Sequence, residues 1–261
     1  MTPRQPSAHG RVSLQQHLHA VREQTRALVA PLSAEDQCVQ SMADASPAKW
    51  HLAHTTWFFE TMVLVPLAAG YRPYDERFSM LFNSYYESLG PRHPRPQRGL
   101  LTRPSVAEVG AYKAAIDTAL NTFIEPADDD TWAAAEPLST RGLHHEQQHQ
   151  ELLLTDMLRL LSLNPLLPAY RTGRTAPRQV SMAPAAHSAD ANLLQQLHDT
   201  AWQSTGSSDD PYPGFHVPAG AVGEYNGKFM VGPVVLRGGS RAAPGIAPQH
   251  HPAASNQRIT R

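Results

Sequence analysis

Two histidines four positions apart in a strongly helical segment constrain this chain most. His145 and His149 lie within residues 144–151, and side chains at this spacing share one face of a helix, so both imidazoles can reach one metal ion. A metal site needs a third ligand, and the best candidate is His54, far upstream within residues 50–60. The three residues predict a histidine metal site between two packed helices.

Composition excludes several classes of partner. The 261-residue chain has 22 Lys plus Arg against 23 Asp plus Glu, a net charge of −1, so no basic field favours nucleic acid or an anionic membrane. A single cysteine, Cys38, excludes an internal disulfide framework and fits a reducing compartment. Residues 1–10 lack a signal-peptide core, and no apolar run approaches the roughly 20 residues that cross a bilayer. We expect a cytoplasmic protein with small-molecule partners, and neither nucleic acid nor membrane among them.

Residues 11–168 are predicted to be helical. Apolar residues recur at helical spacing, and Ser33, Ser46 and Ser105 are candidate N-caps. The predicted helices cover residues 12–29 (ended by Pro31), 33–42, 46–67, 105–123 and 139–162. Residues 70–104 hold prolines, arginines and glycines with little periodicity, which predicts a long crossing. Four long helices predict a bundle, an architecture in which inward side chains meet at a buried metal.

The pattern changes after Pro168. Residues 169–192 have few large apolar side chains and are predicted to be a linker. Residues 193–240 are rich in glycine and turn residues, with a tight turn at Asn226-Gly227 and a strand at 231–236; short strands of this kind bury little apolar surface, so poor order is expected there. Residues 241–261 show no period, which predicts a disordered tail. The predicted fold is mainly α: a four-helix bundle, a linker and an incomplete, irregular β-containing segment.

Four stretches resemble the ergothioneine-biosynthesis sulfoxide synthases: residues 46–61, 81–87, 145–152 and 219–231. The resemblance implies a two-domain non-haem iron enzyme, with a DinB-like helical bundle over 11–168 and a domain of the sulfatase-modifying-factor (formylglycine-generating) type, here only partial, over 193–240. Such enzymes use O2 to join the sulfur of cysteine or gamma-glutamylcysteine to the imidazole carbon of hercynine, giving a sulfoxide.

The resemblance also implies roles for single residues. His54, His145 and His149 would bind Fe(II), and Gln148 would help to hold the trimethylated histidine substrate. Neutral imidazoles suit Fe(II), and three ligands on one face leave positions open for a thiolate and O2. Tyr85 and Tyr86 are candidates for a catalytic phenol that supplies a proton.

Several residues have two interpretations. Arg92, Arg95 and Arg98 could bind the carboxylates of the thiol substrate, because arginine forks match carboxylates, or they could be solvated loop charges. The remaining histidines near the motifs are expected to face solvent or to make local hydrogen bonds. The aromatic residues of the first motif are expected in the core, and a cation–π cage for a trimethylammonium group is the alternative. The histidines are His51, His144 and His187, and the aromatic residues are Trp50, Trp57, Phe58 and Phe59.

The departures from the family pattern leave alternatives open. The second domain lacks counterparts of its N-terminal and central parts near residues 171–192, and residues 241–261 match nothing in the family, a pattern that suggests an internal deletion and a shifted reading frame. The chain could therefore be an inactive, truncated remnant that folds and binds metal. It could also be a DinB-like metal-dependent thiol transferase, which needs only the bundle and a divalent ion.

Overall fold

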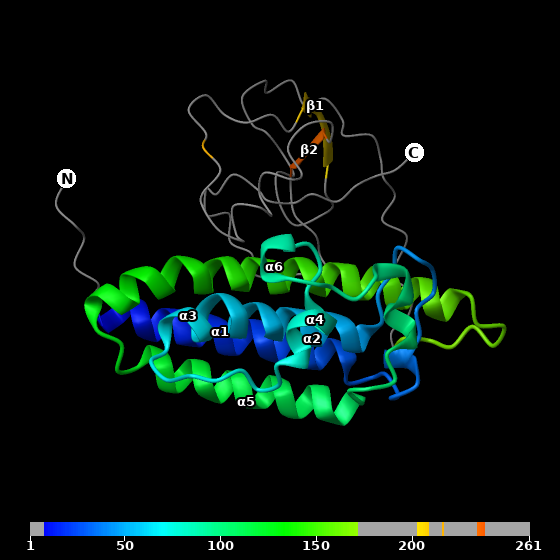
Figure 1. Ribbon diagram of the computed structural model, residues 1–261. Helices are drawn as coiled ribbons and strands as arrows, with labels where there is room; N and C mark the ends of the chain where they lie inside the picture. Colours follow the sequence, from blue (N-terminus) through cyan, green and yellow to red (C-terminus); the bar gives the residue numbers. More distant parts are fainter. Residues whose placement is uncertain (1–7, 172–202, 209–215, 217–233, 238–261) are drawn as a thin grey trace, which may run out of the picture.

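Four long helices lie side by side in the computed structural model, which describes residues 8–171, 203–208, 216 and 234–237 (Figure 1). They are α1 (Ala8–Val29), α2 (Ala48–Phe59), α5 (Val106–Ile124) and α6 (Asp129–Ser162). Helices α1 and α2 each pack against both α5 and α6. The predicted mainly α bundle is confirmed, and the apolar faces of these helices form one core.

Helix α2 continues beyond its α-helical part. A π-helical turn, Glu60–Leu64, and the short α3 (Val65–Leu67) extend it to the predicted end. Its predicted N-cap is wrong, because Pro47 occupies that position and makes no capping bond. Ser46 instead donates its backbone N–H to Asp156 Oδ2 at 2.8 Å, which ties the start of α2 to α6.

The two helices after the crossing begin at side-chain caps. Ser105 and Glu108 form the predicted capping box of α5. Helix α6 begins ten residues before its predicted start at 139, since Asp128 accepts a hydrogen bond from the Thr131 N–H at 2.8 Å. Acidic residues in the first turn also favour a start there. Pro137 then lies inside the helix without ending it.

The crossing between α2 and α5 is more regular than predicted. It contains α4 (Arg77–Phe82) and two 3-10 turns, Glu87–Leu89 and Arg95–Leu100. The side chain of Gln40 anchors the second turn, because Gly99 N–H donates to its Oε1 at 2.7 Å and its Nε2 donates to the Arg95 carbonyl at 2.9 Å.

The short helix predicted over residues 33–42 is only a 3-10 turn, Asp36–Cys38. Ser33 and Asp36 do exchange the expected hydrogen bonds, at 3.0 and 3.1 Å. The backbone becomes extended at Val39, where the bonds of Gln40 to the crossing compete with a further helical turn.

Two short strands, β1 (Gln203–Ser208) and β2 (Val234–Arg237), pair antiparallel, with a register shift between Ser204 and Ser208. Strand β2 overlaps the strand predicted at 231–236. The remaining C-terminal predictions lie outside the described residues: most of the linker, the turn at 226–227, the poor order of the rest of 193–240, and the tail. Among the helices that the structure describes, none has the length and apolarity to span a membrane.

Close packing of α2 on α6 depends on a glycine. A Cβ built on Gly142 would lie 2.5 Å from Cε1 of Phe59, a fully buried side chain. We expect Gly142→Ala to lower the free energy of urea unfolding by about 1–3 kcal/mol, because the core must shift to admit the methyl group. Gly110 of α5 is the matched control, because among the described residues no atom outside its own stretch of helix lies within 4 Å of its Cβ position. Gly110→Ala should raise stability by up to about 1 kcal/mol, so equal effects at both sites would contradict the packing argument.

Candidate metal centre

Helices α2 and α6 bring His54, His145 and His149 together. One ring nitrogen from each lies within 4.8 Å of the others. The ring centroids are 4.9 Å apart for His54 and His145, 4.7 Å for His54 and His149, and 4.6 Å for His145 and His149. This group could hold a metal ion. The convergence of His145 and His149 follows from their spacing on one helix, whereas the packing of α2 on α6 brings in His54.

The orientation of His54 leaves one nitrogen available. Its Nδ1 donates to the carbonyl of Phe82 at 2.6 Å, so the proton sits on Nδ1 and Nε2 keeps its lone pair. A carbonyl partner of this kind commonly fixes the tautomer of a metal-binding histidine. The ring also stacks on Trp50, with centroids 4.5 Å apart and planes at 15°.

His145 carries a polar atom that fits a metal. Its Nδ1 is buried and has no hydrogen-bond partner among the described residues. Buried polar atoms are nearly always satisfied, so an unpartnered one needs an explanation, of which a bound ion or water is one. A metal ion bound at this nitrogen would satisfy it, and three imidazoles are a suitable donor set for Fe(II) or Zn(II).

His149 contacts His51, for which the sequence predicted the wrong environment. His51 was expected to face solvent or to bond locally, but it is buried and its Nδ1 lies 2.8 Å from Nδ1 of His149. Nε2 of His51 lies 3.1 Å from Oδ2 of Asp156. The three side chains form a hydrogen-bonded chain that links α2 to α6 and ends at the candidate metal site. His144 is exposed, as expected, and His187 lies outside the described residues.

Burial lowers the pKa of every histidine in this cluster. Loss of solvent is the largest cause for His51, His54 and His149, and His145 also disfavours the charged forms of His54 and His149. Burial lowers the pKa of His145 to about 4, although the neighbouring Glu146 favours its charged form. The rings are therefore neutral at pH 7, which is the form that binds metals.

The metal-free protein should lose stability as the pH falls from about 6.5 to about 4. The histidine pKa values are lower in the folded state, so the unfolded chain binds these protons first and acid favours unfolding. For His145 alone, a shift from 6.5 to about 4 corresponds to about 3 kcal/mol. Urea unfolding of chelator-treated protein at pH 7.5, 6.0 and 5.0 measures this, and His145→Gln should flatten the dependence while His144→Gln should not. A free energy that is constant from pH 7.5 to 5.0 would refute it.

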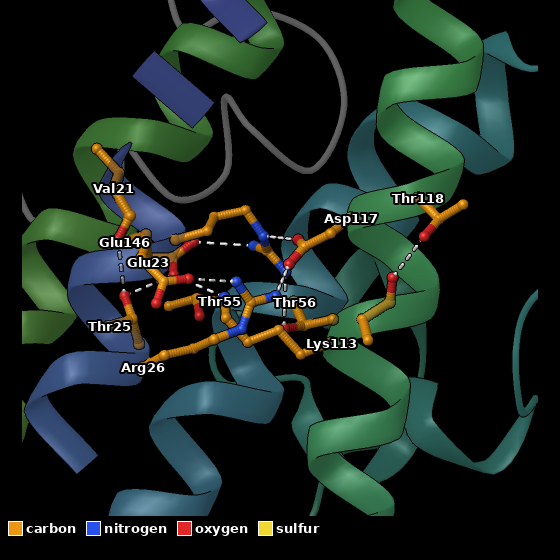
Figure 2. A network of polar contacts seen from close by, with 12 residues as sticks. Val21, Glu23, Thr25, Arg26, Thr55, Thr56, Lys113, Asp117, Thr118 and Glu146 are labelled. Carbon is orange, nitrogen blue, oxygen red and sulfur yellow. Dashed lines mark hydrogen bonds and ion pairs between the residues drawn. The ribbon is translucent and has the colours of Figure 1, made fainter. Parts of the chain in front are cut away.

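A buried ion cluster fixes α6 beside His145. Glu146 accepts from Lys113 and Arg22 at 2.9 Å each and from the Thr25 hydroxyl at 2.6 Å. Arg22 also donates to Asp117 and, at 3.2 Å, to Thr56. Figure 2 shows Thr25, Thr56, Lys113, Asp117 and Glu146 of this cluster converging from separate helices. Because the cluster joins α1, α2, α5 and α6, it holds the four helices in register next to the histidines.

The charges in this cluster shift the pKa values of its members. Burial alone would raise the pKa of Glu146, but Lys113 and Arg22 outweigh it and lower the value to about 2. Burial and the nearby Arg22 lower the pKa of Lys113 to about 8. The carboxylate is thus ionised across the physiological range.

The predicted substrate residues lie around the crossing. Arg98 is 3 % exposed and lies 3.3 Å above the Trp50 ring, so its interpretation as a solvated charge is wrong. Arg95 donates to the Tyr85 hydroxyl at 2.9 Å, and exposed Arg92 donates to the Ser84 carbonyl at 3.4 Å.

The other predicted residues near the site differ in exposure. Tyr86 is buried, whereas Tyr85 and Gln148 are half-buried. The aromatic residues of the first motif belong to the core, as expected: Trp50, Trp57, Phe58 and Phe59.

Sequence reasoning missed His51, Asp156 and Glu146. The first two carry a usable signal: His51 precedes His54 by three positions, and Asp156 follows His149 by seven, so each shares a helix face with a candidate ligand. Glu146 lies next to His145 but points into the ion cluster, and its partners come from two other helices, α1 and α5. No local pattern indicates that contact.

Comparison with known proteins identifies the bundle. A family model described as the DinB superfamily matches residues 17–153, more than half of the chain, and this range contains all three clustered histidines. No curated protein matches the sequence. The helical architecture agrees with the family match, and the chain belongs to the DinB superfamily.

Proposed function

We propose that this protein is a non-haem iron enzyme that uses O2 to join cysteine or gamma-glutamylcysteine to hercynine, giving a sulfoxide. The observation that carries the proposal is the three-histidine cluster of α2 and α6, with one buried nitrogen that lacks a partner among the described residues. The resemblance of residues 46–61, 81–87 and 145–152 to ergothioneine-pathway synthases supplies the reaction. Overall, a thiol S–H and a hercynine C–H are lost, C–S and S–O bonds form, and O2 yields the sulfoxide oxygen and one water.

His54, His145 and His149 would hold the iron, which would supply a Lewis acid that lowers the pKa of the thiol and a place for O2, the oxidant of the sulfur, to react. The three protein ligands leave open positions for this chemistry. Gln148, half-buried beside His149, is proposed to hold hercynine in place.

Two arginines of the crossing are suited to the carboxylates of the thiol substrate. The Nε atoms of Arg95 and Arg98 are buried without partners in the described part of the chain. Burial, together with the nearby Arg95, lowers the pKa of Arg98, so a bound carboxylate would offset an unfavourable concentration of positive charge. Arg92 is more exposed and already donates to Glu87 at 3.2 Å.

A phenol of the crossing is proposed to supply a proton. The Tyr86 ring lies 5.7 Å from Trp57, whose ring lies 5.7 Å from His54. Tyr85 accepts a hydrogen bond from Arg95, which would link proton supply to substrate binding. Unchanged sulfoxide yield in both Tyr85→Phe and Tyr86→Phe would refute this role.

We propose a domain division that follows the same resemblance. Residues 11–168 form the DinB-like bundle, 169–192 a linker, 193–240 a partial domain of the sulfatase-modifying-factor type, and 241–261 a tail. The antiparallel pair β1 and β2 lies within the third range, which supports a β-containing unit there.

A DinB-like thiol transferase is the second candidate. It is favoured by the fact that all three histidines lie within the matched bundle, residues 17–153, so a metal-activated thiolate would need no second domain. Its activity would be independent of O2, whereas the synthase requires O2.

The test is anaerobic reconstitution with Fe(II), followed by hercynine, either thiol, and O2, with mass detection of the sulfoxide conjugate. Product in the wild type and in His144→Ala, but not in His145→Ala, would support the synthase and identify its thiol. Thiol transfer without O2 would support the second candidate. No turnover with one iron bound per chain would refute both and leave the non-catalytic remnant.

A further inference from the structure

The hydrogen-bonded series Asp156–His51–His149 suggests a role for Asp156 and His51 that is separate from substrate chemistry. We propose that Asp156 and His51 are positioning residues that hold His149 in the one tautomer able to present Nε2 to a metal ion. The inference rests on the metal-binding part of the proposed function and is independent of the substrate.

Proton positions in this chain follow from the donors and acceptors. An ionised Asp156 can only accept, so Nε2 of His51 must carry the proton that the two share at 3.1 Å. In a neutral His51, Nδ1 is then an acceptor. Nδ1 of His149, 2.8 Å away, must therefore be the donor. This leaves the lone pair of His149 on Nε2.

The surrounding structure keeps both partners in place. His51 is 3 % exposed, so the neutral ring is favoured and water does not compete for its nitrogens. The backbone N–H of Ser46 donates to Oδ2 of Asp156 at 2.8 Å, which holds the carboxylate against the first turn of α2. His51 lies one turn before His54 on that helix, so the outer pair and the candidate ligands form adjacent layers between α2 and α6.

This arrangement has a chemical consequence. A carboxylate that polarises the outer N–H of a ligating imidazole makes the metal-binding nitrogen more basic and fixes its direction. Loss of such a partner typically lowers metal affinity by about 10–100-fold. Asp156→Asn can present its amide N–H to His51, which would reverse the tautomers of His51 and His149 and place a proton on Nε2 of His149.

The test is Co(II) titration of the chelator-treated full chain, followed by the absorption of bound Co(II), for wild type, Asp156→Asn, His51→Leu and the double variant. We expect the Kd of each single variant to rise about 10–100-fold. The Kd of the double variant should not exceed that of the single variant that binds Co(II) more weakly, because both substitutions interrupt the same series of hydrogen bonds. His144→Gln, exposed on the same helix, is the control and should bind Co(II) like the wild type.

A second measurement separates positioning from a merely structural role. Nitrogen-15 spectra of the metal-free protein should show His149 protonated at Nδ1 in the wild type and shifted towards Nε2 in Asp156→Asn, with unchanged helical circular dichroism. Single-variant Kd values within about twofold of the wild type, additive losses in the double variant, or a wild-type His149 protonated at Nε2 would each overturn the proposal. A wild type that binds no Co(II) would overturn the metal site as well, whereas normal Co(II) results without sulfoxide formation would count against the synthase alone.

Discussion

Replacement of His145 with alanine should lower the affinity of the chain for Fe(II) or Co(II) by at least about 100-fold, because even the loss of an outer hydrogen-bond partner costs 10–100-fold. His145 is one of three clustered imidazoles, and two remaining ligands hold a divalent transition metal poorly. Titration of chelator-treated protein, monitored by Co(II) absorption, measures the change. An affinity within about threefold of the wild type would exclude His145 as a ligand.

His145 is the best of the three positions for this test, because its removal disturbs least. Nδ1 of His145 has no partner in the described part of the chain, so alanine breaks no hydrogen bond of that atom. Loss of His54 would leave the Phe82 carbonyl without its donor, and loss of His149 would do the same to His51. The control is His144→Ala at the exposed neighbouring position. This variant should bind metal with the affinity of the wild type and unfold at the same urea concentration as the wild type.

The candidate site divides into a part that local spacing predicts and a part that it does not. Residues four apart on one helix must share a face, so His145 and His149 follow from the sequence alone. The pairing of α2 with α6 adds His54, and in the sequence this residue is indicated only by the resemblance of residues 46–61 to the sulfoxide synthases. The contact of His51 with His149 joins positions 98 apart in the chain, and it depends on the relative rotation of two helices, which no local pattern fixes.

The same distinction holds for the fold. The capping box at Ser105 is a local signal and gives the start of α5 correctly. The start of α6 was predicted too late, although Asp128 offers a local cap and acidic residues follow it. The length of the turn after Asp36 depends on Gln40, whose bonds reach Arg95 and Gly99 in the crossing. Tertiary contacts of this kind override helix propensity.

Removal of the charge on Glu146 should have the largest effect on stability. Glu146→Gln preserves the shape of the side chain but leaves Arg22 and Lys113 buried without their shared carboxylate. Breaking a buried pair in this way costs about 3–5 kcal/mol. Urea unfolding at pH 7 measures the loss. The matched control is Glu23→Gln, which removes an exposed pair with Arg26 and should cost less than about 1 kcal/mol.

Two further properties identify the mechanism of that loss. The folded-state pKa of Glu146 is lowered to about 2, so its stabilising contribution is complete above about pH 4.5 and disappears as the pH falls towards 2; Glu146→Gln should therefore differ least from the wild type in strong acid. Lys113→Met in the Glu146→Gln background should recover part of the stability, because it removes one uncompensated buried cation and lowers the desolvation cost. If the two substitutions were instead additive, each would act through packing alone, and the charge cluster would not be what holds the four helices in register beside the histidines.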